Sequence, residues 1–316
     1  MIDISIVIPL LNEDESLKEL HDWIRRVVIE QGLTYEIIFV DDGSKDNSWQ
    51  VISELHLEDP AVKGIRFQRN YGKSAALHVG FEKAIGKVVM TMDADLQDSP
   101  EEIPGFLDMI HKQGFDLVSG WKKVRHDPIS KTIPTRLYNY ATRMMSGIKL
   151  HDFNCGIKAY RLEVVKSMEI FGEMHRYIPV IAKREGFDKI GEKVVQHRAR
   201  KYGKSKFGLE RFVNGFLDLM TISFISRFGK KPMHFFGTIG MIMFFIGLIA
   251  FGVLGGNKLM HIINNETAKN LADQSIFYVA LTAMIIGTQL FLAGFLGELI
   301  ARNGEGRNNY RVSDSV

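Results

Sequence analysis

Residues 88–98 read Val-Val-Met-Thr-Met-Asp-Ala-Asp-Leu-Gln-Asp, an apolar run of strand length that ends in two carboxylates one residue apart. At the end of a buried strand, Asp93 and Asp95 can converge on one point, and their hard oxygen ligands suit Mg²⁺ or Mn²⁺. Aspartate is also common in the polar turns that follow strands. This stretch alone therefore leaves both a metal site and an ordinary turn open.

Strand-like and helical patterns alternate around this stretch. Short apolar runs rich in β-branched residues predict strands, and apolar residues at helical spacing between them predict helices. The predicted strands cover residues 4–10, 35–40, 62–67, 87–92 and 116–119. This alternation predicts an α/β domain with a mostly parallel, Rossmann-like sheet and flanking helices.

Three of the predicted strands end in polar residues. Asn12 and Glu13 follow the first strand, Asp41 and Asp42 end the second, and residues 93–95 follow the fourth. Because ligands of such sheets bind beyond the carboxyl ends of the strands, these clusters are expected to converge on one site. The convergence favours a ligand site over an ordinary polar turn.

Two common nucleotide motifs are absent or incomplete. No G-x-G-x-x-G follows the first strand, which disfavours a dinucleotide fold. Gly72-Lys73-Ser74 resembles the end of a P-loop, but Phe67 stands where that motif requires its first glycine. A kinase or ATPase signature is therefore excluded, and Lys73 lies either near the mouth of the site or at a solvated helix start.

Bulk composition narrows the class of protein. A chain of 316 residues predicts about two domains, and its net charge of +3 is too small to indicate a nucleic-acid partner. The single cysteine, Cys155, excludes an internal disulfide framework and cysteine-rich zinc sites. Because Met1-Ile2-Asp3 leads straight into a strand without a basic segment, we expect no signal peptide.

Two uncharged apolar stretches, residues 235–254 and 276–297, are each long enough to cross a bilayer. The alternative is a pair of buried core helices. Basic residues flank the two stretches, namely Arg227, Lys230 and Lys231 before the first and Arg302, Arg307 and Arg311 after the second. The positive-inside rule then predicts an inner-membrane protein with two spans and both termini in the cytoplasm.

These patterns predict four regions. A cytoplasmic catalytic domain covers residues 1–206, amphipathic interfacial helices cover 207–231, two transmembrane helices cover 232–303, and a polar tail covers 304–316. The apolar face of the second region could instead pack against the catalytic domain. We expect the tail to be disordered.

A small homo-oligomer is compatible with the apolar spans. Glycine-rich helix faces, such as those of Gly287 and Gly294, allow close helix packing between copies.

The charge changes sign after the acidic stretch. Basic residues cluster at Lys122, Lys123, Arg125, Lys131, Arg136 and Arg143. They form either a solvated basic face or a site for a second, anionic substrate. Residues 197–206 add a basic, glycine-containing loop that could fold over phosphates.

Several motifs resemble those of family 2 glycosyltransferases, which have the GT-A fold. The matching segments are residues 6–9, 12–13, 40–44, 69–72 and 93–97. With residues 154–161, the basic loop and two C-terminal spans, the whole chain is similar to the polyprenyl-phosphate glycosyltransferases. That group includes dolichyl-phosphate mannose synthases, bactoprenol glucosyltransferases and the undecaprenyl-phosphate aminoarabinose transferase. Processive polysaccharide synthases carry a Gln-x-x-Arg-Trp motif. After Gln196 this chain has Ala199 and Arg200 where that motif has Arg and Trp, which disfavours the processive branch.

The resemblance implies roles for individual residues. It places Pro9, Leu11, Glu13, Asp41 and Asp42 around the nucleobase and ribose, together with Asp93. It assigns the divalent cation, Mg²⁺ or Mn²⁺, to Asp93, Asp95 and Gln97.

On the acceptor side, the resemblance assigns the lipid phosphate to Lys122 and Arg136, and the neighbouring Arg125 and Lys131 are candidates for the same role. The family usually has arginine at the position of Lys122, and lysine keeps the charge but loses bidentate geometry. Arg200 and Lys206 correspond to the loop that closes over both phosphates, and Asp152 to an acidic position considered as a base.

The implied reaction is an inverting attack by polyprenyl phosphate, such as undecaprenyl phosphate, on a nucleotide-diphosphate sugar. Because a phosphate monoester has its second pKa at about 6, it is mostly dianionic at neutral pH and needs little activation, so Asp152 is expected to position groups rather than abstract a proton. A uridine donor such as UDP-glucose is favoured over GDP-mannose, and aminoarabinose stays open.

Non-enzymatic alternatives are a membrane-anchored nucleotide-sugar-binding protein and a transporter. A sensor would not need the acceptor-side cations, and the spans carry no internal charge before Glu298.

Overall fold

The structure is a computed structural model of the whole chain, and it describes residues 2–123, 129–172, 174–196, 198, 201, 232–265, 270–302 and 312–316. The chain divides into two compact units. One unit comprises Met1–Ser223 together with Arg307–Val316, and the other comprises Phe224–Gly306. The predicted interfacial helices at 207–231 lie outside the described residues.

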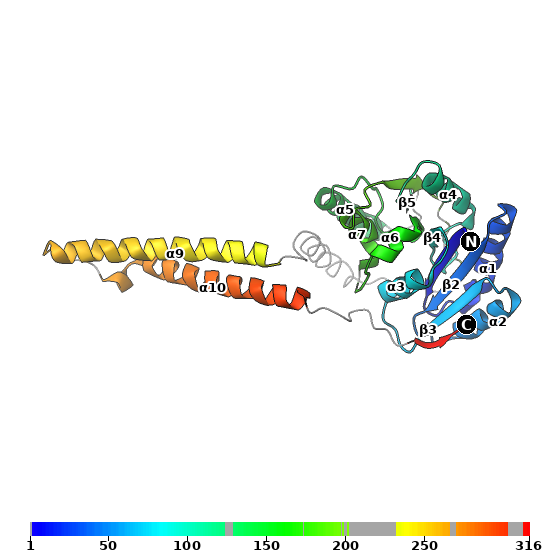
Figure 1. Cartoon of the computed structure of the whole chain (residues 1–316), viewed down its shortest axis with the longest axis horizontal. Coiled ribbons are helices and arrows are strands. Elements are labelled where there is room, and N and C mark those ends of the chain that lie inside the picture. The colour runs from blue at the N-terminus through cyan, green and yellow to red at the C-terminus, as the bar shows by residue number, and fades with distance from the viewer. Residues whose placement is uncertain are drawn as a thin grey trace. The chain divides into compact units, whose positions relative to one another are not determined.

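An eight-stranded sheet with the order β7-β5-β6-β4-β1-β2-β3-β8 forms the centre of the first unit (Figure 1). The pairs β4–β1, β1–β2, β2–β3 and β5–β7 are parallel, whereas β6 runs antiparallel to β4 and β5, and β8 runs antiparallel to β3. The sheet is therefore mixed, with its parallel part where the sequence predicted it. The strands are β1 Ile4–Leu10, β2 Tyr35–Asp41, β3 Val62–Phe67, β4 Val88–Thr91, β5 Leu117–Trp121, β6 Lys158–Arg161, β7 Ile190–Val194 and β8 Val312–Ser315.

Helices cover both faces of the sheet. Ile4, Ile6 and Ile8 of β1 join a core with apolar residues of α1, α2 and α4, whereas Gly80 of α3 packs against Val7 on the opposite face. Successive side chains of a strand point to opposite faces of the sheet, and helices cover both faces here. All of β1 is therefore buried. The helices of this unit are α1 Asp14–Glu30, α2 Ser48–Glu58, α3 Lys73–Lys83, α4 Ile103–His111, α5 Ile129–Ser146, α6 Leu162–Ser167 and α7 Ile178–Arg184.

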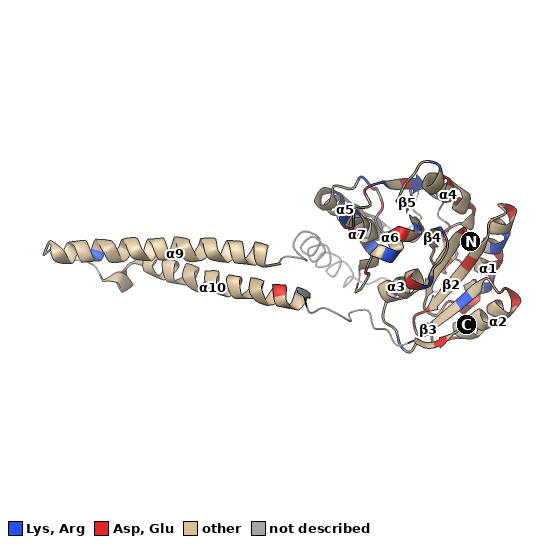
Figure 2. Ribbon diagram, viewed as in Figure 1, with Lys and Arg blue, Asp and Glu red and all other residues tan. Residues whose placement is uncertain are grey.

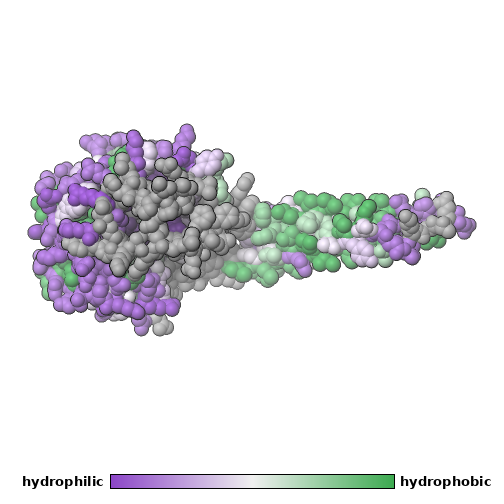
Figure 3. Space-filling view, turned by 180° about the vertical axis from the view of Figure 1, so that it is seen from behind, coloured by the Kyte–Doolittle hydropathy of each residue, from purple (hydrophilic) through white to green (hydrophobic). Residues whose placement is uncertain are grey.

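The second unit contains two long helices, α9 Pro232–Ile263 and α10 Ser275–Arg302. Both are long and apolar enough to cross a membrane. Figure 2 shows hardly any charged residue on them, and Figure 3 shows apolar residues over their surface. Large side chains such as Ile249 and Val279 are 66% and 67% exposed. This exposure argues against the alternative that the two helices are the core of a soluble domain.

Glycines form the contact between α9 and α10. A Cβ atom on Gly240 would lie 2.6 Å from the carbonyl oxygen of Gly287, and one on Gly294 would lie 3.1 Å from the backbone nitrogen of Gly237. Small residues of this kind allow membrane helices to approach closely. Gly287 and Gly294, which the sequence offered for contacts between copies, face α9 of the same chain, and a homo-oligomer stays a prediction.

The end of the polar tail is ordered, contrary to the prediction of disorder. Strand β8 pairs with β3, with Asp314 opposite Arg66 and Ser315 opposite Ile65. The tail escaped prediction because four residues carry too weak a pattern to indicate a strand, and the pairing depends on an edge that only the folded sheet offers.

Candidate active site

Asp93 follows β4 and is held between a lysine and a glycine. The Lys73 ammonium, at the first residue of α3, forms an ion pair with the Asp93 carboxylate. A Cβ atom on Gly156 would lie 2.4 Å from Oδ2 of Asp93, so only glycine fits beside this carboxylate. The Asp93 side chain keeps about a third of its surface exposed, at 32%. Lys73 therefore lies at the site and not at a solvated helix start.

The turn after Asp93 fixes the second carboxylate. Oδ1 of Asp95 accepts a hydrogen bond of 3.2 Å from the backbone N–H of Gln97. Between them, Leu96 has a φ of +60°, a conformation that is unfavourable for a buried leucine and typical of functional turns. This turn directs both aspartates beyond the end of β4.

The same turn anchors the start of the basic loop. The Gln97 side-chain amide donates to the carbonyl of Arg198 over 3.3 Å, and the N–H of Arg198 donates to the carbonyl of Gln97 over 3.0 Å. The Arg198 guanidinium lies 4.3 Å from the ring centre of Trp23, and Lys201 pairs with Glu19 at 2.7 Å. The basic loop thus starts beside the acidic turn.

Buried charges lie behind the aspartates. The Lys122 ammonium is 2.7 Å from Oδ1 of Asp98, whose side chain is fully buried, and Lys122 itself is only 14% exposed. Lys158 on β6 is also buried, and its ammonium donates to the carbonyl of Cys155. Lys122 thus already has a carboxylate partner inside the protein, whereas the sequence assigned it to the acceptor phosphate.

Electrostatic shifts follow from this crowding. Burial by itself raises the pKa of Asp93, but the ammonium groups of Lys73, Lys122 and Lys158 outweigh it and lower the pKa to about 2. Burial lowers the pKa of Lys158. For Lys122, burial acts in the same direction, but the Asp98 carboxylate outweighs it and raises the pKa. The site therefore holds Asp93 ionised at neutral pH.

The ends of β1 and β2 are tied to each other by side-chain to backbone hydrogen bonds. Asn12, with a φ of +56°, donates its N–H to the Ser44 hydroxyl over 2.9 Å, and its side-chain oxygen accepts the N–H of Lys45 at 2.8 Å. Glu13 donates its N–H to the Ser48 hydroxyl over 3.0 Å. Leu11 is thereby held at the rim of a cavity, while Pro9 lies buried inside β1.

The two predicted carboxylates after β2 hold loops. Asp42 accepts the N–H groups of Tyr71 and Gly72 at 2.7 and 2.9 Å, and burial raises its pKa. Asp41 is fully buried, accepts the N–H of Ser44 at 2.8 Å and lies 3.5 Å from the Arg66 guanidinium.

These carboxylates bind the protein itself and do not line the cavity, although Asp41 holds Ser44 of its wall. Gly43 completes the wall with a φ of +75°, at a position where a Cβ would lie 2.7 Å from the backbone carbon of Arg69.

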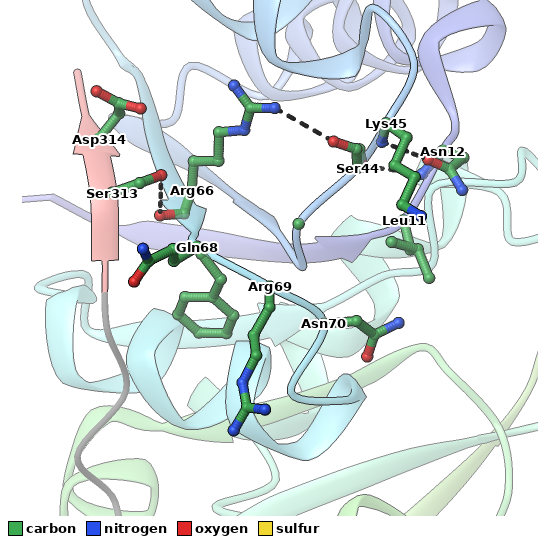
Figure 4. A pocket seen from close by; sticks show the side chains of 12 residues that line it. Leu11, Asn12, Ser44, Lys45, Arg66, Gln68, Arg69, Asn70, Ser313 and Asp314 are labelled. Atoms are coloured by element: carbon green, nitrogen blue, oxygen red, sulfur yellow. Dashed lines mark hydrogen bonds between the residues drawn. The ribbon is translucent and has the colours of Figure 1, made fainter.

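A cavity of about 860 Å³ opens at the ends of β1, β2 and β3 (Figure 4). Its lining comes from Leu11 and Asn12, from the loop 43–45, from residues 66–70 and from β8 through Ser313 and Asp314. Asp93 and Asp95 do not line this cavity but follow β4, the neighbour of β1 on the other side. The site thus has a cavity at one end and an acidic turn at the other.

Asp152 is buried beyond β5. Its N–H donates to Glu192 of β7 over 3.0 Å, its carbonyl accepts the Ser119 hydroxyl at 3.3 Å, and its carboxylate accepts the N–H of Asn154 at 3.1 Å. The Asp152 carboxylate also interacts electrostatically with Lys158. The structure thus connects Asp152 with the charge cluster behind Asp93.

Several predicted residues cannot be placed. Arg125, Arg200 and Lys206 lie outside the described residues, and the side chains of Lys131 and Arg136 on α5 are not described. Their predicted roles stay predictions.

Sequence reasoning missed Asp98 and Lys158. Asp98 is the third acid of residues 93–98, a spacing that could have drawn attention to it. Nothing in the local sequence marks Lys158 as buried, because its burial depends on the antiparallel pairing of β6 with β4 and β5.

Comparison with known proteins identifies the family of this chain. Residues 5–168 match the family described as "Glycosyl transferase family 2". The chain belongs to this family.

Relatives along the whole chain share this family. The dodecaprenyl-phosphate galacturonate synthase of Rhizobium johnstonii is 33% identical over 307 residues, covering 95% of this chain and 88% of that protein. The undecaprenyl-phosphate 4-deoxy-4-formamido-L-arabinose transferase of Shewanella sediminis is 33% identical over 316 residues, covering 98% and 92%. Both confirm the predicted resemblance.

Solved structures confirm the fold class. Glucosyl-3-phosphoglycerate synthase from Mycobacterium tuberculosis, in complex with Mn²⁺, uridine diphosphate and glucosyl-3-phosphoglycerate, superimposes with a TM-score of 0.55. It is 20% identical, and the match covers 72% of this chain and 80% of that one. At this identity the likeness supports the fold alone.

Proposed function

We propose that the protein transfers a sugar from a nucleoside-diphosphate sugar to a polyprenyl phosphate at the cytoplasmic face of the inner membrane. The observation that carries the proposal is that a cavity at the ends of β1–β3 and an acidic turn after the neighbouring β4 occur in a chain with two exposed apolar helices. The names of both whole-chain relatives, which include a polyprenyl phosphate, support the acceptor class.

The donor fits along the ends of the strands. Its nucleoside would occupy the cavity beside Leu11, and its diphosphate would extend toward Asp93 and Asp95 after β4. Lys73 stands between these parts, because it begins α3 and reaches Asp93. Its ammonium can stabilise negative charge on the departing diphosphate without leaving the site.

The carboxylates of Asp93 and Asp95 are a fitting donor set for a divalent cation. Their hard oxygens suit Mg²⁺ or Mn²⁺. Among the described residues no group of three or more histidine, cysteine or acidic side chains completes a metal site, so water and donor phosphates would fill the other positions, as is usual for Mg²⁺. When bound, the ion supplies positive charge to the leaving group.

The acceptor needs orientation more than activation. Because a phosphate monoester is largely dianionic above its second pKa of about 6, its oxygen can attack the anomeric carbon directly and with inversion. Asp152 is buried, and its carboxylate accepts the N–H of Asn154. Its negative charge also acts to raise the pKa of Lys158, and both interactions suit a positioning role. Arg125, Lys131, Arg136, Arg200 and Lys206 are the proposed cations around the two phosphates.

Two helices, α9 and α10, bring the reaction to a membrane. Their exposed apolar surfaces match a bilayer, and the basic residues before α9 and after α10 favour cytoplasmic chain ends by the positive-inside rule. The proposed regions are the catalytic domain 1–206, interfacial helices 207–231, spans 232–303 and the tail 304–316. A homo-oligomer is compatible with this arrangement.

The donor is proposed to be a UDP-sugar. UDP-glucose is the first candidate, GDP-mannose and an aminoarabinose donor are the alternatives, and the names of the relatives add galacturonate and formamido-arabinose as sugar classes.

The decisive experiment incubates the full-length protein in detergent with undecaprenyl phosphate, Mn²⁺ and one radiolabelled nucleotide sugar at a time. We expect label in the organic phase with one donor and none after chelation. Nucleotide-sugar binding without transfer to any polyprenyl phosphate would contradict the proposal and favour a nucleotide-sugar-binding protein.

A further inference from the structure

The C-terminal residues pair with β3 of the catalytic sheet, at a position where a glycine leaves room for them. The N–H and carbonyl of Val316 each form a 3.0 Å hydrogen bond with Gly64 of β3, and the Ser313 hydroxyl donates to the carbonyl of Arg66 over 3.2 Å. A Cβ on Gly64 would lie 2.9 Å from the Val316 side chain and 3.2 Å from the Trp49 ring. The glycine thus leaves the space that the last residue of the chain occupies.

This docking brings two polar side chains to the cavity. Ser313 and Asp314 line it together with Arg66, Gln68 and Lys45 from the body of the domain (Figure 4). These two residues come from the end of the chain, far outside the family match at 5–168. The cavity wall therefore includes a segment that follows the second apolar helix in the sequence.

The order of the strands says which part of a donor would meet β8. The sequence β4-β1-β2-β3-β8 puts β8 four strand spacings from β4, which is about 19 Å at the usual spacing. Asp93 and Asp95 follow β4 and face the diphosphate in the proposed function. The β8 wall accordingly lies at the opposite end, where the nucleoside would be.

The chemistry of Asp314 agrees with a nucleoside and disagrees with phosphate. An ionised carboxylate only accepts hydrogen bonds, and it repels anions. The base N–H groups and ribose hydroxyls of a nucleoside are uncharged donors. The nearby Arg66 is engaged with Asp41 at 3.5 Å and with the carbonyl of Ser44 at 3.2 Å, so Asp314 adds an acceptor at the cavity wall.

We infer that β8 is a functional wall of the donor pocket and that Asp314 accepts a hydrogen bond from the nucleoside of the donor. This inference rests on the proposed function and adds a specificity-determining residue to it. Strand β8, which follows the membrane helices in the sequence, then contributes to donor recognition.

The test measures binding of UDP and of pyrophosphate, both with Mn²⁺, to the full-length protein in nanodiscs by calorimetry. Asp314→Ala should weaken UDP binding by about tenfold or more, since losing a hydrogen bond to a charged group has at least this effect. Pyrophosphate binding should stay unchanged or strengthen, because the variant removes a negative charge and pyrophosphate has no nucleoside. A chain ending at residue 311 should weaken UDP binding at least as much as Asp314→Ala.

Ser315→Ala is the matched control, because Ser315 belongs to β8 but does not line the cavity. Unchanged UDP binding in Asp314→Ala, or equal losses for UDP and pyrophosphate, would overturn the inference. If the unmodified protein binds none of the common nucleoside diphosphates, the proposed function itself fails. If it binds one and the variants bind it equally well, only the role of β8 fails.

Discussion

The catalytic unit buries charged side chains, whereas the helical unit exposes apolar ones. Asp98, Lys122 and Lys158 lie in the interior beside the acidic turn, and residues such as Ile249 lie at the surface of α9. Each arrangement is costly in water, since buried charges lose hydration and exposed apolar groups order solvent. In the catalytic unit, pairing such as that of Lys122 with Asp98 offsets this cost, whereas the exposed apolar surface of α9 and α10 fits a lipid environment.

The largest expected effect comes from the acidic turn. Asp95→Ala should reduce sugar transfer by about a thousandfold or more, because the proposed divalent cation loses a carboxylate ligand and the leaving diphosphate loses the charge that stabilises it. The protein should stay folded and in the membrane fraction. The measurement is radiolabelled lipid product at saturating donor, with near-UV circular dichroism as the folding control. Full activity of this variant with chelator present would refute the metal site.

Breaking one buried ion pair tests the charged side of the comparison. Lys122→Met should cost about 3–5 kcal/mol of stability at pH 7, because it leaves the buried Asp98 carboxylate unpaired. Without Lys122, burial keeps the pKa of Asp98 in the folded chain above its unfolded value of about 3.9. As the pH falls, Asp98 in the folded state therefore takes up a proton before Asp98 in the unfolded state does. The loss of stability in Lys122→Met should accordingly be smaller at pH 5 than at pH 8.

Thermal melting of both proteins across this pH range provides the measurement. The double variant Lys122→Met with Asp98→Asn is the control, and it should recover most of the stability at pH 7. A loss in Lys122→Met that is the same at pH 5 and pH 8 would contradict the explanation by an unpaired carboxylate.

A matched pair of lysine substitutions tests the apolar side. Leu57 of α2 and Ile249 of α9 are both exposed, at 83% and 66%, but only Ile249 is expected to face lipid. Ile249→Lys should disfavour membrane insertion by about 3 kcal/mol, whereas Leu57→Lys should be neutral. The protein recovered in the membrane fraction after alkaline washing measures the difference. Equal recovery of the two variants would argue that α9 does not lie in the bilayer.

The smallest predicted effect sharpens the role of Lys73. Because its ammonium pairs with Asp93, it would compete with the proposed metal ion in the absence of nucleotide. Lys73→Met should therefore tighten binding of Mn²⁺ alone by at most about fivefold, the upper range of a partly exposed ion pair. The same variant should slow transfer, because the charge facing the leaving diphosphate is gone. Electron paramagnetic resonance of Mn²⁺ provides the measurement, and weaker Mn²⁺ binding would show that Lys73 organises the carboxylate instead.

Much of the fold could be predicted because its signals are local. Apolar runs marked β1 to β5, polar residues at strand ends marked the site, and long uncharged stretches marked α9 and α10. Asp93 and Asp95 stood out because a buried strand ended in them. These features depend on neighbours a few residues apart, so periodicity and composition were sufficient.

The sequence by itself determined the alternating fold, the family motifs and the two apolar helices. Only the tertiary structure decided the antiparallel pairing of β6 that buries Lys158, the partnership of Lys122 with Asp98, and the return of β8 to the cavity. Each of these joins residues that are far apart in the chain. Their free energy comes from pairing charges or filling a sheet edge in the folded molecule, and no local pattern of hydrophobicity reports it.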